Sequence, residues 1–242
     1  MYVWIGVAIV TFITLFFIKA PFGRHVNEKF GKMMSNTWGW VIMEFPSMFF
    51  ISLFFIIGSG EKGFYNYFFL GLWLMHYVNR TFIFPFRLRN KDKKIPVAIV
   101  LSAVFFNLVN GSTNGLFLGE FKTYEANYFL NPHFIIGVSM FLIGWGINLW
   151  ADHQILNLRK PGDTHYVMPK GGLFNYLSSP NLFGEIIEWI GFAIAANHLA
   201  AYGFAIWTCA NLIPRCRDHY NWSKTHFENY PTERKILIPF IW

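Results

Sequence analysis

Apolar residues fill seven long runs along the chain, and short polar segments separate these runs. A helix needs about 20 consecutive apolar residues to cross a bilayer. The pattern therefore predicts an all-α integral membrane protein with seven spanning helices in one bundle. The helices are expected at Tyr2–Ile18, Trp38–Ile57, Phe64–Phe86 and Ile95–Leu118, from His133 into a polar stretch at Asn148, from Asn181 to Ala196, and at Leu199–Ile213.

The composition of the 242 residues supports this class. Hydrophobic residues make up 54% of the chain and charged residues only 14%, whereas about 25% of the residues of a soluble domain are charged. No polar block is long enough for a separate soluble domain, so we expect a single transmembrane domain over residues 1–242. A bacterial inner membrane or an endoplasmic-reticulum-type membrane would suit a multi-pass protein of this kind.

The lysines and arginines predict the orientation, because positively charged short loops stay in the cytoplasm. The loops after the first, third, fifth and seventh runs hold most of the cations, and the opposite loops hold only Lys62 and Lys122. We therefore expect the amino end outside and the carboxyl tail in the cytosol. The formal net charge of +7 also fits a surface for a phosphorylated cofactor. Arg80 and Arg159 favour that interpretation, since they lie within or at the end of a run.

A group of polar residues lies where the fifth and sixth helices are expected. Asn148, Asp152 and Arg159 fall at helical spacing, so they share one face of the fifth helix. Asn181 opens the sixth helix, and Glu185 follows one turn later. Polar and charged groups are costly at membrane depth, so a functional pocket is expected here. Two simpler interpretations remain: a polar zipper of Asn148, Asp152 and Arg159, and an N-cap role for Asn181.

Two further polar positions interrupt the second and third runs. Glu44 lies two residues before Pro46, whose missing N–H is expected to kink or free the backbone around it. Tyr77 stands beside His76 and close to Arg80, so this part of the third helix is expected to line a pocket. Alternatively, Glu44 is a structural carboxylate and Tyr77 an interface aromatic. The asparagines at 107, 110 and 114 are interpreted as hydrogen-bonding partners between helices and left outside the predicted site.

Motifs of soluble enzymes are missing from the sequence. There is no GxGxxG after a strand, no Walker loop and no HExxH, so nicotinamide binding cannot be argued from a Rossmann fingerprint. Gly144-Trp145-Gly146 lies in an apolar run, where small residues permit close helix packing. Cys209 and Cys216 offer neither a disulfide framework nor a metal site, and we expect no metal.

Several separated motifs give the chain a resemblance to the membrane steroid 5α-reductase family. They occur in the family order and cover nearly the whole chain: Trp40 with Glu44-Phe45-Pro46-Ser47, His76-Tyr77 with Arg80-Thr81, Gly146-Ile147-Asn148, Asp152, Leu158-Arg159-Lys160-Pro161-Gly162, Gly171-Gly172-Leu173-Phe174, Asn181, Gly184-Glu185-Ile186-Ile187-Glu188-Trp189, Tyr230-Pro231, Arg234-Lys235 and Ile238-Pro239-Phe240. The sequence departs from the pattern of animal members at Phe84 and around Ser223.

The resemblance implies a seven-helix enzyme that uses NADPH to reduce the 4,5 double bond of a 3-oxo-4-ene steroid. Residues 1–118 would form the substrate side and residues 133–242 the cofactor side. The implied catalytic pair is Glu44 and Tyr77, which contact the 3-oxo group, and Trp40 is assigned to the substrate with them. The residues assigned to the cofactor are Arg80, Asn148, Asp152, Arg159, Asn181, Glu185, Arg215 and His219.

This chemistry is reasonable on its own terms. Hydride delivered to the β-carbon of an enone leaves negative charge on the carbonyl oxygen, so hydrogen-bond donors aimed at that oxygen lower the barrier. A neutral tyrosine can donate, and so can a buried glutamate that stays protonated. The expected partners are a steroid or lipid enone and membrane lipid, with no nucleic acid and no obligate protein partner.

Other functions remain open at this stage. A polyprenol or an enoyl thioester also carries a double bond on a long apolar body. A membrane methyltransferase that uses S-adenosylmethionine shares a similar carboxyl half, but methyl transfer to a thiolate needs no acid pair such as Glu44 and Tyr77. A transporter would be expected to show inverted repeats with broken helices, which the sequence does not contain.

Overall fold

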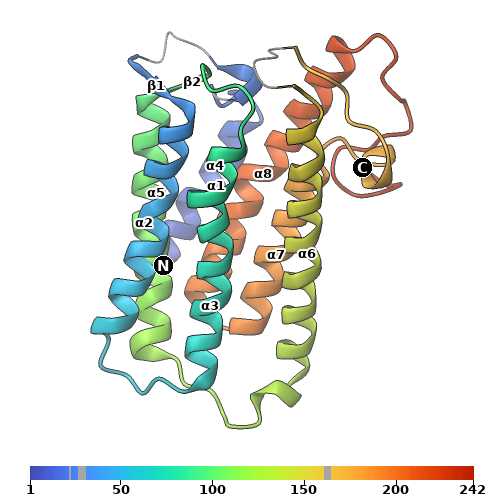
Figure 1. Ribbon diagram of the computed structural model, residues 1–242. Coiled ribbons are helices and arrows are strands. Elements are labelled where there is room, and N and C mark those ends of the chain that lie inside the picture. The colour runs from blue at the N-terminus through green and yellow to red at the C-terminus, as the bar shows by residue number, and fades with distance from the viewer. Residues whose placement is uncertain (22, 27–30, 161–164) are drawn as a thin grey trace. The chain divides into compact units, whose positions relative to one another are not determined.

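The computed structural model of the protein describes residues 1–21, 23–26, 31–160 and 165–242. This part of the chain is mostly helical (Figure 1). Three of its helices are long and apolar enough to cross a membrane: Asn36–Ile57, Val97–Phe121 and Pro132–Asn157. The number of spans and the orientation of the chain stay predictions.

The chain forms two compact units. Unit 1 combines Met1–Ala20 with Ile135–Trp242, and unit 2 is Pro21–Phe134. The elements of unit 2 are a 3-10 turn at Gly23–His25, β1 (Met33–Ser35), α2 (Asn36–Ile57), α3 (Phe64–Val78), a π-helix at Asn79–Ile83, α4 (Phe84–Arg87), β2 (Lys94–Pro96), α5 (Val97–Leu116), a π-helix at Phe117–Phe121 and a 3-10 turn at Tyr128–Leu130. Its helices match the second, third and fourth predicted runs.

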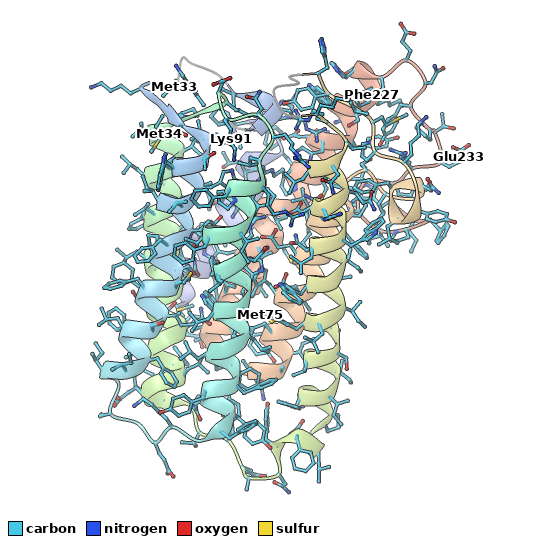
Figure 2. All side chains as sticks on the ribbon, viewed as in Figure 1. Met33, Met34, Met75, Lys91, Phe227 and Glu233 are labelled. Carbon is cyan, nitrogen blue, oxygen red and sulfur yellow. The ribbon has the colours of Figure 1, made fainter. Side chains whose placement is uncertain are left out.

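A small antiparallel sheet precedes α2 and α5 and was not predicted. Met33 of β1 pairs with Pro96 of β2, and Ser35 pairs with Lys94. Met33 and Met34 are labelled at this strand in Figure 2. The two three-residue strands are an exception to the predicted all-α fold. Met33–Ser35 was expected in the polar segment before the second run, Lys94 in the basic loop, and Ile95 and Pro96 at the start of the fourth helix. Strands this short carry too little periodicity to be read from the sequence.

Glycines bring α2 and α5 into close contact. Gly111, Gly115 and Gly119 recur every four residues and so lie on one face of the helix. A Cβ added to Gly115 would lie 2.4 Å from the carbonyl oxygen of Ile51, and one on Gly119 would lie 2.6 Å from that of Phe55. Such distances leave no room for a methyl group. Small residues of this kind let helix backbones approach each other in membranes, where packing rather than the hydrophobic effect drives association.

The described residues of unit 1 form four helices and a short 3-10 helix. They are α1 (Tyr2–Leu15), α6 (Pro132–Asn157), the 3-10 helix Gly172–Asn175, α7 (Pro180–Ala196) and α8 (Leu199–His226). The first helix packs against the last, since Trp207 Nε1 donates to the carbonyl oxygen of Trp4 at 3.0 Å and the two indole rings lie 4.6 Å apart. Unit 1 therefore joins segments from both ends of the described chain.

In unit 1, α6 and α7 run antiparallel along a seam of small residues. A Cβ on Gly144 would lie 2.5 Å from the carbonyl oxygen of Gly184, and one on Gly184 would lie 2.6 Å from that of Gly144. Gly137 and Gly191 meet in the same reciprocal way. The predicted packing role of Gly144-Trp145-Gly146 is thus confirmed at Gly144. It is wrong at Gly146, where an added Cβ would meet nothing within 4 Å.

The end of the last helix in unit 1 differs from the prediction. The seventh run was expected to end at Ile213 with a tail from Pro214, but α8 continues through Pro214 to His226. Cys216 lies in a buried cluster with Leu182, Ile186, Leu212 and Leu237. A proline removes one backbone hydrogen bond from a helix interior, so the continuity of α8 depends on contacts other than that bond.

The segment after α8 folds back on unit 1. Figure 2 labels Phe227 and Glu233, between which the chain turns away from the helix end. Lys235 then pairs with Leu177 as a parallel β-bridge, with backbone hydrogen bonds of 2.8 Å to Tyr176 O and 3.0 Å from Ser178 N. The returning segment is therefore held just before the start of α7.

Candidate active site

Tyr77 is fixed in the interior of unit 2 by its neighbours. Its side chain is 4% exposed, and its ring stacks on that of Trp73 with centroids 5.4 Å apart. Trp73 is held in turn, because its Nε1 donates to the Ser47 hydroxyl of α2 at 3.1 Å. Buried aromatic side chains with a satisfied polar end are rigid anchors. The phenol of Tyr77 therefore has a defined position.

Asn107 of α5 lies between Tyr77 and Glu44. The Tyr77 hydroxyl donates to Asn107 Oδ1 at 3.5 Å, and Asn107 Nδ2 donates to Glu44 Oε2 at 3.4 Å. The same Nδ2 donates to the backbone carbonyl of Met43 at 2.5 Å. Three helices thus bring the two predicted catalytic side chains to one amide. The sequence-based prediction left Asn107 outside the site. The feature that could have indicated it was a polar residue within an apolar run.

The backbone around Glu44 follows the helix rather than breaking it. Pro46 lies inside α2, which continues from Asn36 to Ile57. A proline has no N–H to offer the preceding turn, and polar side chains of neighbouring helices commonly satisfy backbone groups freed in this way. Pro46 removes the helical partner of the Ile42 carbonyl, four residues earlier, whereas Asn107 bonds the neighbouring Met43 carbonyl. The kinked or freed backbone expected around Glu44 stays a prediction, and α2 continues through this position.

Arg80 lies against two aromatic rings of unit 2. Its guanidinium carbon is 4.5 Å from the ring centroid of Trp40 and 4.9 Å from that of Phe84, a geometry that allows cation–π attraction. Arg80 belongs to the π-helix Asn79–Ile83, and π-turns within α-helices occur often at functional sites. Trp40 and Arg80, assigned to substrate and cofactor respectively, are thus direct neighbours.

Four of the residues assigned to the cofactor form one polar cluster in unit 1. Asn148 Nδ2 of α6 donates to the Asn181 carbonyl at 3.0 Å and to Glu185 Oε2 at 3.5 Å. Asn181 Nδ2 of α7 donates to Asp152 Oδ1 at 3.0 Å. Asn148 and Asp152 are 1% and 6% exposed. The prediction that these polar groups share one region is confirmed by these contacts.

The N-cap interpretation of Asn181 is wrong. Ser179 is the N-cap residue of α7, and the helix begins at Pro180. Asn181 is the second helical residue, so its side chain is free to reach across to α6. The sequence misplaced this boundary because Ser179 and Asn181 are both common capping residues.

Arg159 does not share the helical face of Asn148 and Asp152. The helix α6 ends at Asn157, and Arg159 lies in the following turn. Its guanidinium carbon is 5.4 Å from the centroid of the Tyr166 ring. The proposed three-residue zipper is therefore limited to Asn148 and Asp152 with their partners on α7. The adjoining Pro161-Gly162 motif lies outside the described residues.

Arg215 and His219 place α8 beside the start of α7. Arg215 is next to Cys216, which lies in one buried cluster with Leu182 and Ile186 of α7. One turn further, His219 Nδ1 lies 3.2 Å from the hydroxyl oxygen of Ser179. Six of the predicted cofactor residues therefore surround the first turns of α7.

The segment after α8 adds polar residues that the sequence did not assign to the site. The Tyr230 hydroxyl bonds that of Ser178, and Arg234 Nη2 donates to the carbonyl of Pro169 at 2.8 Å. Arg234 is only 3% exposed. Burial raises the pKa of the Tyr230 phenol and lowers the pKa of the Arg234 guanidinium. In the sequence, Tyr230 and Arg234 belong to the motifs Tyr230-Pro231 and Arg234-Lys235, to which no role was assigned.

The donor set of unit 1 fits a dinucleotide. Carboxylates such as those of Asp152 and Glu185 can accept hydrogen bonds from sugar hydroxyls, and guanidinium groups such as those of Arg159 and Arg215 can donate to phosphates. Asn148 Oδ1 is buried and accepts no hydrogen bond from any residue that the structure describes. A buried acceptor of this kind is normally satisfied, and an amide or hydroxyl of a ligand would satisfy it.

The predicted residues divide between the two units. Trp40, Glu44, Tyr77 and Arg80 belong to unit 2, whereas the other seven assigned residues belong to unit 1. Within the described ranges, no group of three histidine, cysteine, aspartate or glutamate side chains could hold a metal ion.

Comparison with known proteins extends over almost all of the sequence. The family model described as 3-oxo-5-alpha-steroid 4-dehydrogenase matches residues 93–242. A steroid 5-alpha-reductase of Gossypium hirsutum is 38% identical over 98% of this chain and 93% of its own length. The 3-oxo-5-alpha-steroid 4-dehydrogenase 1 of Rattus norvegicus is 37% identical over 97% and 91%, and that of Homo sapiens 35% over 92% and 86%.

The chain belongs to the 3-oxo-5-alpha-steroid 4-dehydrogenase family. It is an oxidoreductase that acts on CH–CH bonds, and the predicted enzyme class is confirmed. The three apolar helices agree with a membrane protein. Membership of this family argues against the methyltransferase and the transporter considered from the sequence. The region that includes Glu44 and Tyr77 lies outside the family model but inside the alignment with the cotton relative, which spans 98% of the chain.

Proposed function

We propose that this enzyme uses NADPH to reduce the 4,5 double bond of a 3-oxo-4-ene steroid or a similar lipid enone. The names of the relatives support a steroid substrate. The observation that carries the proposal is the arrangement of Glu44 and Tyr77, which come from different helices and lie within hydrogen-bonding reach of the same amide, that of Asn107. Two donors near one point suit a reaction that builds charge on one oxygen.

In this mechanism the side chains act on the carbonyl end of the substrate. NADPH, when bound, supplies the hydride for the β-carbon of the enone. Tyr77 donates its phenolic hydrogen bond to the carbonyl oxygen, where negative charge develops, and a neutral Glu44 donates to the same oxygen. Trp40, with Arg80 against its ring, forms an aromatic wall for the apolar body of the substrate.

The cofactor is assigned to the polar cluster of unit 1. Arg159 and Arg215 would bind its phosphates, and Asp152 and Glu185 would accept hydrogen bonds from its sugar hydroxyls. Asn148, Asn181 and His219 complete the set, and the buried Asn148 Oδ1 supports a ligand donor at this point. Arg80, in unit 2, is proposed as a further cofactor contact.

The membrane arrangement belongs to the same proposal. Seven spanning helices would place the amino end outside and the carboxyl end in the cytosol, where NADPH is available. The whole chain would act as one reductase domain in a multi-pass membrane protein, with residues 1–118 on the substrate side and 133–242 on the cofactor side. Membrane lipid and the steroid or lipid enone are the expected partners.

A direct assay tests the proposed activity. The purified protein in lipid nanodiscs is mixed with NADPH and a 3-oxo-4-ene steroid, and the product is identified by a mass increase of about two hydrogens and by loss of enone absorbance. A polyprenol and an enoyl thioester are measured in parallel as competing substrate classes. Turnover of either competitor without turnover of the steroid would overturn the assignment of substrate.

A further inference from the structure

Three aromatic side chains gather at the end of α8, and the proposed function assigns no role to them. The rings of Trp222 and His226 are stacked, with centroids 4.2 Å apart and an interplanar angle of 18°. Tyr166 lies across this stack, since its ring centroid is 4.8 Å from that of Trp222 at 67° and 6.1 Å from that of His226 at 85°. Edge-to-face contacts of this kind are favourable beyond the area that they bury. The Tyr166 ring is therefore held in place by two residues of α8.

Arg159 lies against the ring that this stack holds. Its guanidinium carbon is 5.4 Å from the Tyr166 centroid, within the ~6 Å over which a cation is attracted to an aromatic face. Arg159 follows the end of α6 at Asn157, so the helix does not fix its side chain. A flexible arginine side chain loses rotamer entropy when it binds a ligand. Contact with a fixed ring reduces that loss before the ligand arrives.

The same face of α8 carries two residues that are assigned to the cofactor. These two residues and the two stacked rings follow one another at steps of four, three and four positions, and so share one face of the helix: Arg215, His219, Trp222 and His226. His219 also reaches Ser179 at the start of α7. Through Tyr166, Arg159 is thus held at the end of a helix face that carries the second arginine of the proposed phosphate site.

We propose that Tyr166 is a positioning residue for the cofactor, which holds the guanidinium of Arg159 where it meets a phosphate of NADPH. This inference rests on the proposed function, in which Arg159 and Arg215 bind the phosphates. Tyr166 acts through its aromatic face and does not itself touch the cofactor in this scheme. The stack of Trp222 and His226 fixes the ring, so the end of α8 takes part in phosphate binding through an aromatic contact rather than through a charge.

A purely structural role for Tyr166 makes a different prediction. If the ring only attaches residues 165–170 to α8, its loss lowers the stability of the protein, and any effect on the cofactor is the same with and without the Arg159 guanidinium. If the ring positions Arg159, its loss weakens NADPH binding only while that guanidinium is present. A double-mutant cycle of the two residues therefore separates the two roles.

The test measures the dissociation constant of NADPH by calorimetry and the thermal unfolding temperature of each purified protein. Tyr166→Leu removes the aromatic face, Tyr166→Phe removes only the hydroxyl, and each change is made with and without Arg159→Ala. Phe16→Leu is the matched control, because the Arg217 guanidinium carbon lies over the Phe16 ring at the same 5.4 Å and neither residue is assigned to the cofactor. Should Tyr166→Leu fail to fold, Trp222→Leu tests the same ring by removing its support.

We expect Tyr166→Leu to weaken NADPH binding roughly two- to fivefold, which is the usual contribution of a cation–π pair at a partly exposed site. Tyr166→Phe should bind NADPH as tightly as the unchanged protein, because phenylalanine also offers an aromatic face to a cation. In the Arg159→Ala background, Tyr166→Leu should have no further effect. Phe16→Leu should leave the dissociation constant unchanged.

Unchanged NADPH affinity in folded Tyr166→Leu would overturn the inference, and so would equal losses in the presence and absence of the Arg159 guanidinium. A loss in Tyr166→Phe as large as that in Tyr166→Leu would overturn it as well, since the hydroxyl and not the ring would then be responsible. These results leave the proposed function intact when Arg159→Ala by itself weakens binding. Normal affinity in Arg159→Ala, or no NADPH binding by the unchanged protein, would instead contradict the proposed function.

Discussion

The side chain of Asn181 donates to Asp152 Oδ1 at 3.0 Å and so links the start of α7 to the last turns of α6. Two consequences follow from this bond. It orients the Asp152 carboxylate, which is an acceptor of hydrogen bonds. It also occupies the side-chain amide of Asn181, which could otherwise have capped the first turn of α7.

Loss of either Arg159 or Asn181 should weaken NADPH binding. Arg159→Ala removes a charge-assisted phosphate contact worth about 1.5–3 kcal/mol, and Asn181→Ala releases the oriented Asp152. The dissociation constant is measured by calorimetry. Lys91→Ala controls for the change in net charge, because Lys91 is exposed and bonds the Phe86 carbonyl in unit 2. Unchanged affinity in both Arg159→Ala and Asn181→Ala would contradict the assignment.

The enzyme should prefer NADPH to NADH. The arginines and lysines near the proposed cofactor site favour an additional phosphate, and their contribution should fall as salt screens it. The measurement is kcat/KM for each cofactor at low and at high ionic strength. Equal values for both cofactors at low salt would count against a phosphate-specific site.

Removal of the Tyr77 hydroxyl should reduce turnover by roughly 10²–10³, the usual effect of losing one oxyanion donor. Glu44→Gln should also lower the rate, and the double variant should lose less than the product of the single losses. Turnover is measured at saturating NADPH, with cofactor binding followed in parallel.

Tyr65→Phe is the matched control for Tyr77→Phe. It deletes a buried hydroxyl of the same helix that donates to Ala126 O at 3.1 Å and accepts from Phe129 N. This change should cost stability of about 1 kcal/mol and leave kcat unchanged. A comparable loss of rate in both tyrosine variants would show that any damage to α3 slows the enzyme.

Gly144 and Gly146 should respond differently to alanine. A Cβ on Gly144 would lie 2.4 Å from the backbone nitrogen of Glu188, whereas one on Gly146 meets open space. Gly144→Ala should therefore lower the thermal unfolding temperature in detergent, because neither backbone can move without disturbing the seam. Gly146→Ala should leave it unchanged or raise it, since alanine favours a helix by about 0.5–1 kcal/mol over glycine. Equal effects would refute the close packing of α6 on α7.

Cysteine labelling tests the predicted orientation. In a background of Cys209→Ala and Cys216→Ala, Asp92→Cys marks the basic loop after the third run and Glu61→Cys marks the opposite side. A membrane-impermeant maleimide applied to intact cells should label Glu61→Cys and reach Asp92→Cys only after permeabilisation, as positively charged loops stay in the cytoplasm. The reverse pattern would invert the proposed topology.

The sequence predicted the helices well where apolar periodicity was long, and failed where tertiary contacts decide. The turn from Gly58 to Gly63 was placed correctly, because it follows an apolar run without interruption. Pro214 suggested a helix end, but the buried packing of Cys216 keeps α8 continuous. The local sequence does not show such contacts with other helices.

For the candidate site, too, the sequence predicted some residues correctly and missed those that depend on tertiary contacts. Polar residues in apolar runs identified Glu44, Asn148 and Asp152, since such residues are costly in a membrane without a partner. The contacts of Asn107 depend on two other helices that approach it in space. Its neighbour Asn110 looks equivalent in the sequence, yet its Nδ2 donates to Phe106 O of its own helix. Spacing along one helix could not separate the two.

The contact between α1 and α8 also sets an order of assembly. Trp4 and Trp207 are 203 residues apart, so at about 5–20 residues per second of synthesis roughly 10 to 40 seconds pass before they can meet. Unit 2 is one continuous stretch of chain, and the partners α2 and α5 can pair within that interval. Of the helices that the structure describes, α1 is thus the first to be synthesised and among the last to find its partner.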